Sequence, residues 1–248
     1  MSSGHPLVVT LAGVGSTTGG AKAILGAVIT YLQTAGGYRS EDFVEASYKV
    51  EGDGAPLFYR PDDTTQPLEE SVNRVAQNLH WYRLHTERPI HLLGWSLGGV
   101  VLFEALRQLV DEDMTWFQTI RSLVAISSPL LGSDLDGIDL LGELAAGPVG
   151  ADLARRAADK QQKSDVRAAA ERLRRQGIRI VTIASEDDAV VTPADALLPS
   201  LGPEPAAIIL RPRRRFGASY LESILGHGNL PNDPSCWTHV LRAVGRAE

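Results

Sequence analysis

Short apolar runs alternate with longer helical patterns along most of the chain. Continuous runs of branched and apolar residues are typical of strands that a parallel sheet buries on both faces. Such runs occupy residues 7–12, 43–48, 89–93, 122–127, 177–184 and 206–210. This succession of strands and helices predicts an α/β fold, with a mostly parallel sheet and helices on both of its faces.

Between these runs, apolar residues recur at the three- and four-residue spacing of amphipathic helices. One helix is expected over residues 21–33, with glycines at 36 and 37 as a C-cap. Another begins at Pro67, has Glu69 and Glu70 in its first turn and buries an apolar stripe from Leu68 to Leu79. A third follows residue 96, and a closing helix is expected over residues 235–244.

The pattern changes between residues 130 and 176. Leucines mix with glycines and acidic residues up to residue 150, and an Ala- and Arg-rich helical stretch follows, with Ser164 as the N-cap of its second part. We expect residues 130–176 to form a small helical cap inserted between two strands, whose glycines permit movement. Two helices packed on the surface would give the same pattern, so that alternative stays open.

Composition and charge limit the classes of function. The chain has 248 residues, of which 44% are hydrophobic and 22% are charged, so we expect one globular domain over residues 1–248. A net charge of −6 argues against a nucleic acid or a membrane surface as partner. Cys236 is the only cysteine, so no intrachain disulfide can form. The apolar run near the amino end is too short to span a bilayer and lacks a basic leader, so we expect a cytoplasmic protein.

The most informative stretch is the Gly-x-Ser-x-Gly pattern at residues 94–98, which separates an apolar run from a helical pattern. A serine in this setting lies on a sharp strand-to-helix turn, where Gly94 and Gly98 leave room for the strand and helix to approach. Leu97 would begin the helix, so its amide is free and lies at the positive end of the helix dipole. The pattern predicts that Ser96 is a nucleophile and that the Leu97 amide stabilises an oxyanion.

A nucleophilic serine needs a histidine as base and a carboxylate that orients the histidine. Of the six histidines, His227 lies in a glycine-flanked loop after the last strand, where it can reach back over the sheet. His239, inside the closing helix, is the second choice. The turn after the strand at 177–184 offers Asp187 and Asp188 as the acid, and the residues alone do not decide between them.

A glycine-rich loop at residues 13–20 follows the first strand and has a competing interpretation. Its Gly13-x-Gly15-x-x-x-Gly19 pattern is looser than a dinucleotide fingerprint, and the next strand is expected to end at Lys49 instead of an acidic residue that would hold a ribose. A nucleotide-dependent oxidoreductase therefore ranks low. His80 and His85 do not share a helical face, so we expect neither a metal nor a cofactor.

Three motifs together resemble the α/β-hydrolase family, in particular its compact esterases and lipases, over nearly the whole chain. They are Gly94-Trp95-Ser96-Leu97-Gly98-Gly99, Ser185-x-x-Asp188-x-x-Val191 and Gly226-His227-Gly228-Asn229-Leu230-Pro231. The family order of serine, acid and histidine implies a triad of Ser96, Asp188 and His227, and the family spacing selects Asp188. The loop after the first strand would supply the Val14 amide to the oxyanion hole, although Ala12-Gly13 replaces the family's His-Gly. The resemblance also implies a sheet of about six strands.

The resemblance implies a serine hydrolase that cleaves small-molecule carboxylic esters through an acyl-enzyme. We expect Trp95, Leu130 and Leu131 to contact the substrate. A thioesterase stays open, because residues 91–99 are also similar to thioesterases of polyketide and peptide synthesis; Arg211 and the arginines at 213–215 would then meet a phosphopantetheine arm, although a solvated charge run explains them as well. A binding protein that keeps the fold without the reaction is the third possibility.

Overall fold

The computed structural model describes residues 5–112, 118–133, 147–200, 206–212 and 226–245. It contains a six-stranded sheet in which every pair of neighbouring strands is parallel, in the order β2-β1-β3-β4-β5-β6. The predicted parallel sheet of about six strands is therefore confirmed. The strands are β1 (Leu7–Leu11), β2 (Phe43–Glu45), β3 (Ile90–Trp95), β4 (Ile120–Ile126), β5 (Arg179–Ser185) and β6 (Ala207–Leu210).

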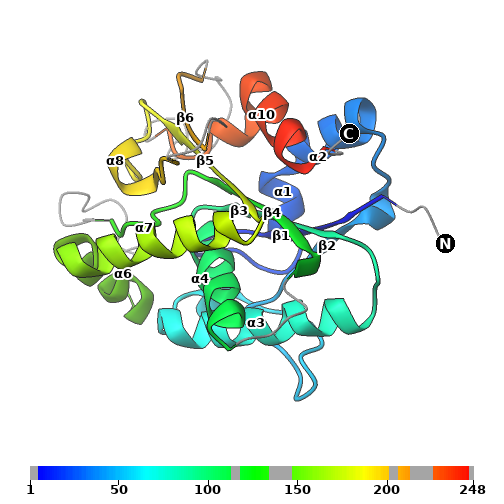
Figure 1. The fold of residues 1–248 in the computed structure, drawn as a ribbon, viewed down its shortest axis with the longest axis horizontal. Helices are drawn as coiled ribbons and strands as arrows, with labels where there is room; N and C mark the ends of the chain where they lie inside the picture. Colours follow the sequence, from blue (N-terminus) through cyan, green and yellow to red (C-terminus); the bar gives the residue numbers. More distant parts are fainter. Residues whose placement is uncertain (1–4, 113–117, 134–146, 201–205, 213–225, 246–248) are drawn as a thin grey trace.

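Alternation of side chains along the strands divides the core into two layers. In β1, Leu7, Val9 and Leu11 belong to the larger core cluster and Val8 to the smaller one, because successive side chains of a strand point to opposite faces. The two groups of helices cover opposite faces of the sheet (Figure 1). The larger cluster includes residues of α3 (Leu68–Leu84), α4 (Leu97–Asp111), α6 (Pro148–Ala158) and α7 (Lys160–Arg175), and the smaller one includes residues of α1 (Gly20–Ile24), α2 (Gly26–Gly36) and α10 (Pro234–Val244).

The helices differ from the predictions in two details. The helix expected over 21–33 is divided into α1 and α2 at Leu25, which has a ψ of 7° and precedes a glycine, a weak helix former. Its expected glycine C-cap is confirmed, since Gly37 adopts a φ of 73° after α2. In the second half of the chain, the N-cap is Asp159 instead of Ser164, because the Asp159 carboxylate accepts hydrogen bonds from the amides of Gln161 and Gln162.

The segment expected as a cap contributes helices to the main body. α6 and α7 place Val149, Leu153 and Leu173, among other residues, in the larger core cluster, and α7 contacts β5 and α4. In this part, α7 acts as the connecting helix between two parallel strands. Residues 134–146 lie outside the described residues, so the cap over 130–176 stays a prediction.

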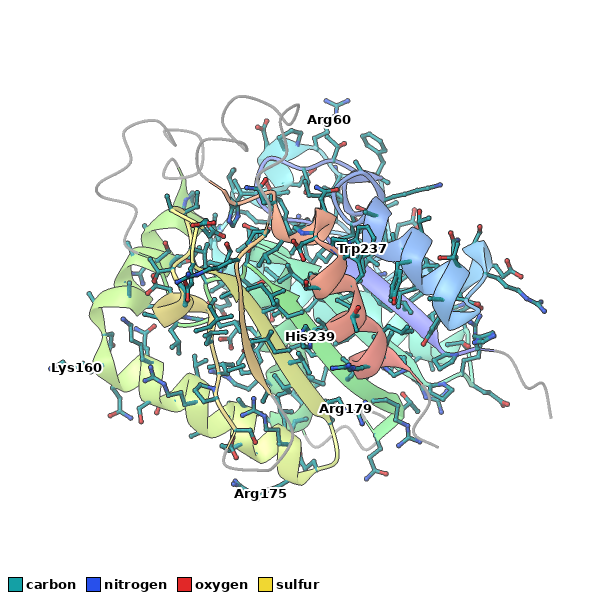
Figure 2. The ribbon with its side chains drawn as sticks, turned by 90° about the horizontal axis from the view of Figure 1, so that it is seen from above. Arg60, Lys160, Arg175, Arg179, Trp237 and His239 are labelled. Atoms are coloured by element: carbon teal, nitrogen blue, oxygen red, sulfur yellow. The ribbon has the colours of Figure 1, made fainter. Side chains whose placement is uncertain are left out.

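The strand order reverses at β1 and β3, which makes their carboxyl ends the topological switch point of the sheet. β1 lies between β2 and β3, so the connections after β1 and after β3 run in opposite directions, the arrangement in which open α/β sheets bind ligands. Arg60 and Arg179 mark opposite ends of the molecule in Figure 2, and Arg179 begins β5, so the loop that carries Arg60 lies at the carboxyl end of the sheet. Within the described ranges, no helix combines the length and the apolar character needed to cross a membrane.

Candidate active site

Ser96 lies at the carboxyl end of β3, on a sharp turn between β3 and α4. Its backbone has a φ of 54° and a ψ of −131°, a conformation that is uncommon for a residue with a side chain. A β-carbon at position 94 would come within 2.4 Å of Gly99, and one at position 98 within 2.2 Å of the Leu11 carbonyl oxygen. Both glycines are therefore required for the approach of strand and helix, as the sequence predicts.

His227 connects Ser96 to Asp188. Its Nε2 atom lies 2.9 Å from the Ser96 hydroxyl oxygen, and its Nδ1 atom lies 2.9 Å from Oδ2 of Asp188. All three residues are buried, with 4 to 7% of their surface exposed. The structure thus brings together the three side chains that the family order singles out, although 131 positions separate the serine from the histidine.

The Asp188 carboxylate is fixed from its other side. Its Oδ1 atom accepts hydrogen bonds from the amides of Val190, at 2.9 Å, and Val191, at 3.0 Å. Asp187, the alternative acid, is exposed to solvent. The geometry therefore pairs Asp188 with the imidazole.

The loop that carries His227 packs tightly against the turn that carries Asp188. A β-carbon at Gly226, where φ is 72°, would come within 2.2 Å of the Asp187 carbonyl oxygen. Trp95 contacts His227 as well. Its Nε1 donates to the His227 carbonyl oxygen at 3.4 Å, and the centroids of the indole and imidazole rings are 4.9 Å apart. These contacts hold the imidazole at the end of β3. His239, the second choice as base, lies on α10 (Figure 2).

The two amides predicted for an oxyanion hole belong to residues near Ser96. Leu97 is the first residue of α4, so its N–H lies among the amides that a helix leaves without an intrahelical partner. Val14 follows Gly13, whose position lies against the Ser96 side chain: a β-carbon there would be 3.0 Å from the hydroxyl oxygen. Among the described residues, none accepts a hydrogen bond from the Val14 amide.

The predicted end of the second strand is wrong, and the error bears on the nucleotide hypothesis. β2 ends at Glu45, not near Lys49, because the chain leaves the sheet after three residues. The second strand therefore does end in an acidic residue, Glu45. Its carboxylate, however, accepts hydrogen bonds from the amides of Gly19 and Ala21 at the start of α1. Those amides are the ones that would face a pyrophosphate in a dinucleotide site, so Glu45 already occupies that position.

The predicted substrate contacts lie in different environments. Trp95 is half-buried beside His227, whereas Leu130 and Leu131 are 0 and 1% exposed and belong to the larger core cluster. A substrate would reach these two leucines only if the surrounding chain moved. The assignment of all three as substrate contacts stays a prediction. Arg211 pairs with Glu186, and the arginines at 213–215 lie outside the described residues.

Ser127 is a residue of this region that the sequence analysis missed. It follows β4, which lies between the strands that end near Ser96 and Asp188. Its φ is 46°, and Ser96 is the other non-glycine residue with a positive φ among the described residues. Its hydroxyl is buried and has no hydrogen-bond partner in the described structure. A serine in a Ser-Ser-Pro sequence signals a turn, but not this backbone conformation.

Two polyketide synthases are similar to part of the sequence. No family model matches the chain. The bikaverin polyketide synthase of Gibberella fujikuroi is 31% identical over 86 residues, and a non-reducing polyketide synthase of Pseudevernia furfuracea is 31% identical over 96 residues. These matches cover 35 and 39% of this chain but 4% of each synthase.

Comparisons of the structure identify the fold. Phospholipase PlaB from Legionella pneumophila superposes with a TM-score of 0.64 at 11% identity, over 96% of this chain and 59% of the phospholipase. Aspergillus fumigatus lipase B gives 0.62 at 17% identity, over 98% of this chain and 53% of the lipase. Bacillus licheniformis lipase BlEst2 gives 0.58 at 14% identity, over 99 and 94% of the two chains. The chain therefore has the α/β-hydrolase fold, which confirms the predicted fold class.

Proposed function

We propose that this protein is a serine hydrolase that cleaves carboxylic esters with Ser96, His227 and Asp188 as its catalytic triad. The observation that carries the proposal is the continuous chain of contacts from the Ser96 hydroxyl through both imidazole nitrogens to Asp188, with 2.9 Å at each step. Lipases and a phospholipase among the structural relatives support the same class of reaction.

Each member of the triad has a defined task. With the proton of the neutral imidazole on Nδ1, facing Asp188, the Nε2 atom of His227 accepts the proton of Ser96 as Oγ attacks the acyl carbon. The amides of Leu97 and Val14 donate to the oxyanion that forms. His227 then gives its proton to the leaving alcohol as the ester C–O bond breaks. Water attacks the resulting acyl-enzyme by the same path and releases the carboxylic acid, which regenerates Ser96.

Turnover of a short aryl ester tests the proposal. Ser96→Ala and His227→Ala should each lose activity by roughly three or more powers of ten, as the removal of triad members does elsewhere. Asp188→Asn should lose a large part of the activity, whereas the matched control Asp187→Asn, at the exposed neighbour, should retain it. An active Ser96→Ala protein contradicts the proposal, and an Asp187→Asn protein as impaired as Asp188→Asn contradicts the choice of acid.

A thioesterase is the second candidate, and the partial similarity to two polyketide synthases favours it. The same triad would cleave an acyl group from a carrier protein or coenzyme A, with a thiol as the leaving group. Turnover of an aryl ester and of the coenzyme A thioester of the same acid separates the two functions. A kcat/KM at least tenfold higher for the thioester would make the thioesterase the better description.

The remaining alternatives predict different results. A binding protein with this fold would leave the ester intact and would not react at Ser96, although its serine and histidine are in contact. A nucleotide-dependent oxidoreductase would gain thermal stability from its cofactor, and the Glu45 contacts at Gly19 and Ala21 argue against it.

A further inference from the structure

The glycine-rich loop after β1 is held by a carboxylate from the neighbouring strand. The carboxylate of Glu45, the last residue of β2, accepts three hydrogen bonds. Its Oε2 atom accepts from the Gly19 amide at 2.6 Å, and its Oε1 atom accepts from the Ala21 amide at 3.1 Å and from the Tyr59 hydroxyl at 2.8 Å. One side chain thus fixes the end of the loop and the start of α1.

Tyr59 and its neighbours hold the rest of the loop. The Tyr59 amide donates to the Thr18 hydroxyl at 2.9 Å, and the Thr18 amide donates to the Tyr59 carbonyl oxygen at 3.2 Å. Nearer the serine, the Gly15 amide donates to the Thr64 hydroxyl at 2.9 Å. The segment that leads to α3 therefore fastens the loop at two points.

The Tyr59 hydroxyl also lies near Ser16, which bonds to Gly13, the glycine that packs against Ser96. It lies 3.4 Å from the Ser16 hydroxyl, which donates to the Gly13 carbonyl oxygen at 2.6 Å. Burial raises the pKa of Tyr59 well above the value of a free phenol, so the hydroxyl stays protonated and remains a donor to Glu45. Each hydroxyl has one proton, which Tyr59 gives to Glu45 and Ser16 gives to Gly13, so the step between Tyr59 and Ser16 is a polar contact at 3.4 Å.

The glycine content of the loop explains why such outside contacts are needed. It contains glycines at 13, 15, 19 and 20, and Gly15 and Gly19 adopt positive φ values of 75° and 88°. Glycines populate many backbone conformations, so the loop would not keep one arrangement without outside contacts. An oxyanion hole is effective only when its donors are already in place as the charge develops.

We propose that Glu45 and Tyr59 are positioning residues for the oxyanion hole: they hold residues 13–20 so that the Val14 amide can donate to the oxyanion beside the Leu97 amide. The inference rests on the proposed hydrolase function. Neither residue contacts the reacting atoms, so each acts through the loop. Both should therefore affect kcat, which depends on stabilisation of the transition state, more than KM.

The test uses Glu45→Gln and Tyr59→Phe, with Tyr82→Phe as the matched control. Glu45→Gln keeps the shape of the side chain, but only one of its two terminal atoms is an oxygen, whereas three donors now bind two carboxylate oxygens. Tyr59→Phe removes only the hydroxyl. The Tyr82 hydroxyl donates its hydrogen bond to the backbone carbonyl of Glu45, at 2.7 Å, instead of to the carboxylate. Tyr82→Phe thus removes a hydrogen bond of the same kind in the same region.

We expect the two test variants to lower kcat for an aryl ester by roughly tenfold to a hundredfold, less than the removal of an oxyanion donor, with KM changed by no more than about twofold. Hydrogen exchange of the amides at 14–21 should become faster in both variants and not in Tyr82→Phe. Should Glu45→Gln not fold, Tyr59→Phe carries the test.

Two results would overturn the inference: a kcat that is unchanged while the loop amides exchange faster, or an exchange rate that both substitutions leave unchanged. A purely structural role would lower the unfolding temperature at constant kcat. Failure of the proposed function is distinguishable, because the unaltered protein would then turn over no ester, whereas exchange reports on the loop without any turnover.

Discussion

Gly13 and Ser96 are packed so closely that a β-carbon at position 13 would lie 2.7 Å from the β-carbon of the serine. Real β-carbons do not approach each other this closely, so a side chain at 13 must displace either the loop or the serine. The loop that carries the proposed oxyanion donor Val14 and the turn that carries the proposed nucleophile Ser96 therefore pack closely against each other.

Gly13→Ala should lower kcat by about tenfold or more, because displacements of about an ångström in a reacting site can cost a hundredfold. Gly26→Ala is the control, since a β-carbon there meets nothing within 4 Å. Steady-state kinetics with an aryl ester, together with the unfolding temperature, measure both variants. Equal kcat values for the two would show that the contact at Gly13 does not matter.

A buried ion pair links α6 to α4. Arg156 lies 2.8 Å from the carboxylate of Glu104 and also donates to the Leu130 carbonyl oxygen at 3.2 Å, with both side chains 10% exposed or less. Without Arg156, the buried Glu104 carboxylate keeps Arg107, at 3.2 Å, as its remaining ion-pair partner among the described residues. Arg156→Met should lower the free energy of unfolding by about 3 kcal/mol, the lower end of the cost of breaking a buried pair, measured by urea denaturation.

The matched control is the next residue in the chain. Arg155 pairs with Asp152 at 2.5 Å, but 70% of its side chain is exposed. Arg155→Met should cost less than about 1 kcal/mol, because water screens exposed ion pairs. Equal losses for the two variants would contradict the assigned difference in burial.

Ser127 combines a positive φ with a buried hydroxyl that has no hydrogen-bond partner in the described structure. Both features are unfavourable for a serine, and glycine removes both. Ser127→Gly should raise the free energy of unfolding by about 1 kcal/mol, and Ser127→Ala by less, because alanine keeps the backbone conformation. A loss of stability in Ser127→Gly would show that the hydroxyl has a partner in solution.

His91 gives a prediction for the effect of pH on stability. It lies in β3, with Nδ1 2.7 Å from the Ser122 hydroxyl oxygen, and burial, followed by the charges of Arg179 and Arg121, lowers its pKa from 6.5 to about 4. Between these two values, the unfolded chain binds a proton at His91 that the folded protein does not bind. Stability should therefore fall as pH falls from 6.5 to 4, by up to about 3 kcal/mol.

Urea denaturation at pH 7 and pH 4.5, for the unaltered protein and for His91→Gln, measures this contribution. The decrease in stability between the two pH values should be smaller in His91→Gln, which cannot take up the proton. An identical decrease in both proteins would show that His91 does not control this part of the pH dependence.

The features predicted from the sequence depend on local constraints. Gly94 and Gly98 mark the turn at Ser96 because no other residue fits against Gly99 and Leu11 there. The apolar runs predict the six strands, because a strand buried on both faces has few polar positions. His227 was identified by its loop between glycines, whereas the choice of Asp188 depended on the family resemblance.

The features that were missed depend on contacts between distant residues. Glu45 is an ordinary strand residue in the sequence, and its contacts with Gly19 and Ala21 become visible only when β2 places it beside them. The end of β2 at residue 45 and the N-cap at Asp159 depend on the same kind of contact. The left-handed backbone of Ser127 follows from its place between two strand ends, which a one-dimensional pattern does not encode.

The most direct test of the account is the reaction of the protein with a fluorophosphonate, followed by mass spectrometry of its peptides. The account predicts that one phosphonyl group adds to Ser96 and that the reaction is roughly a thousandfold or more slower in His227→Ala, which lacks the base. An unaltered protein that does not react at Ser96, or that reacts equally fast without the imidazole, would contradict it.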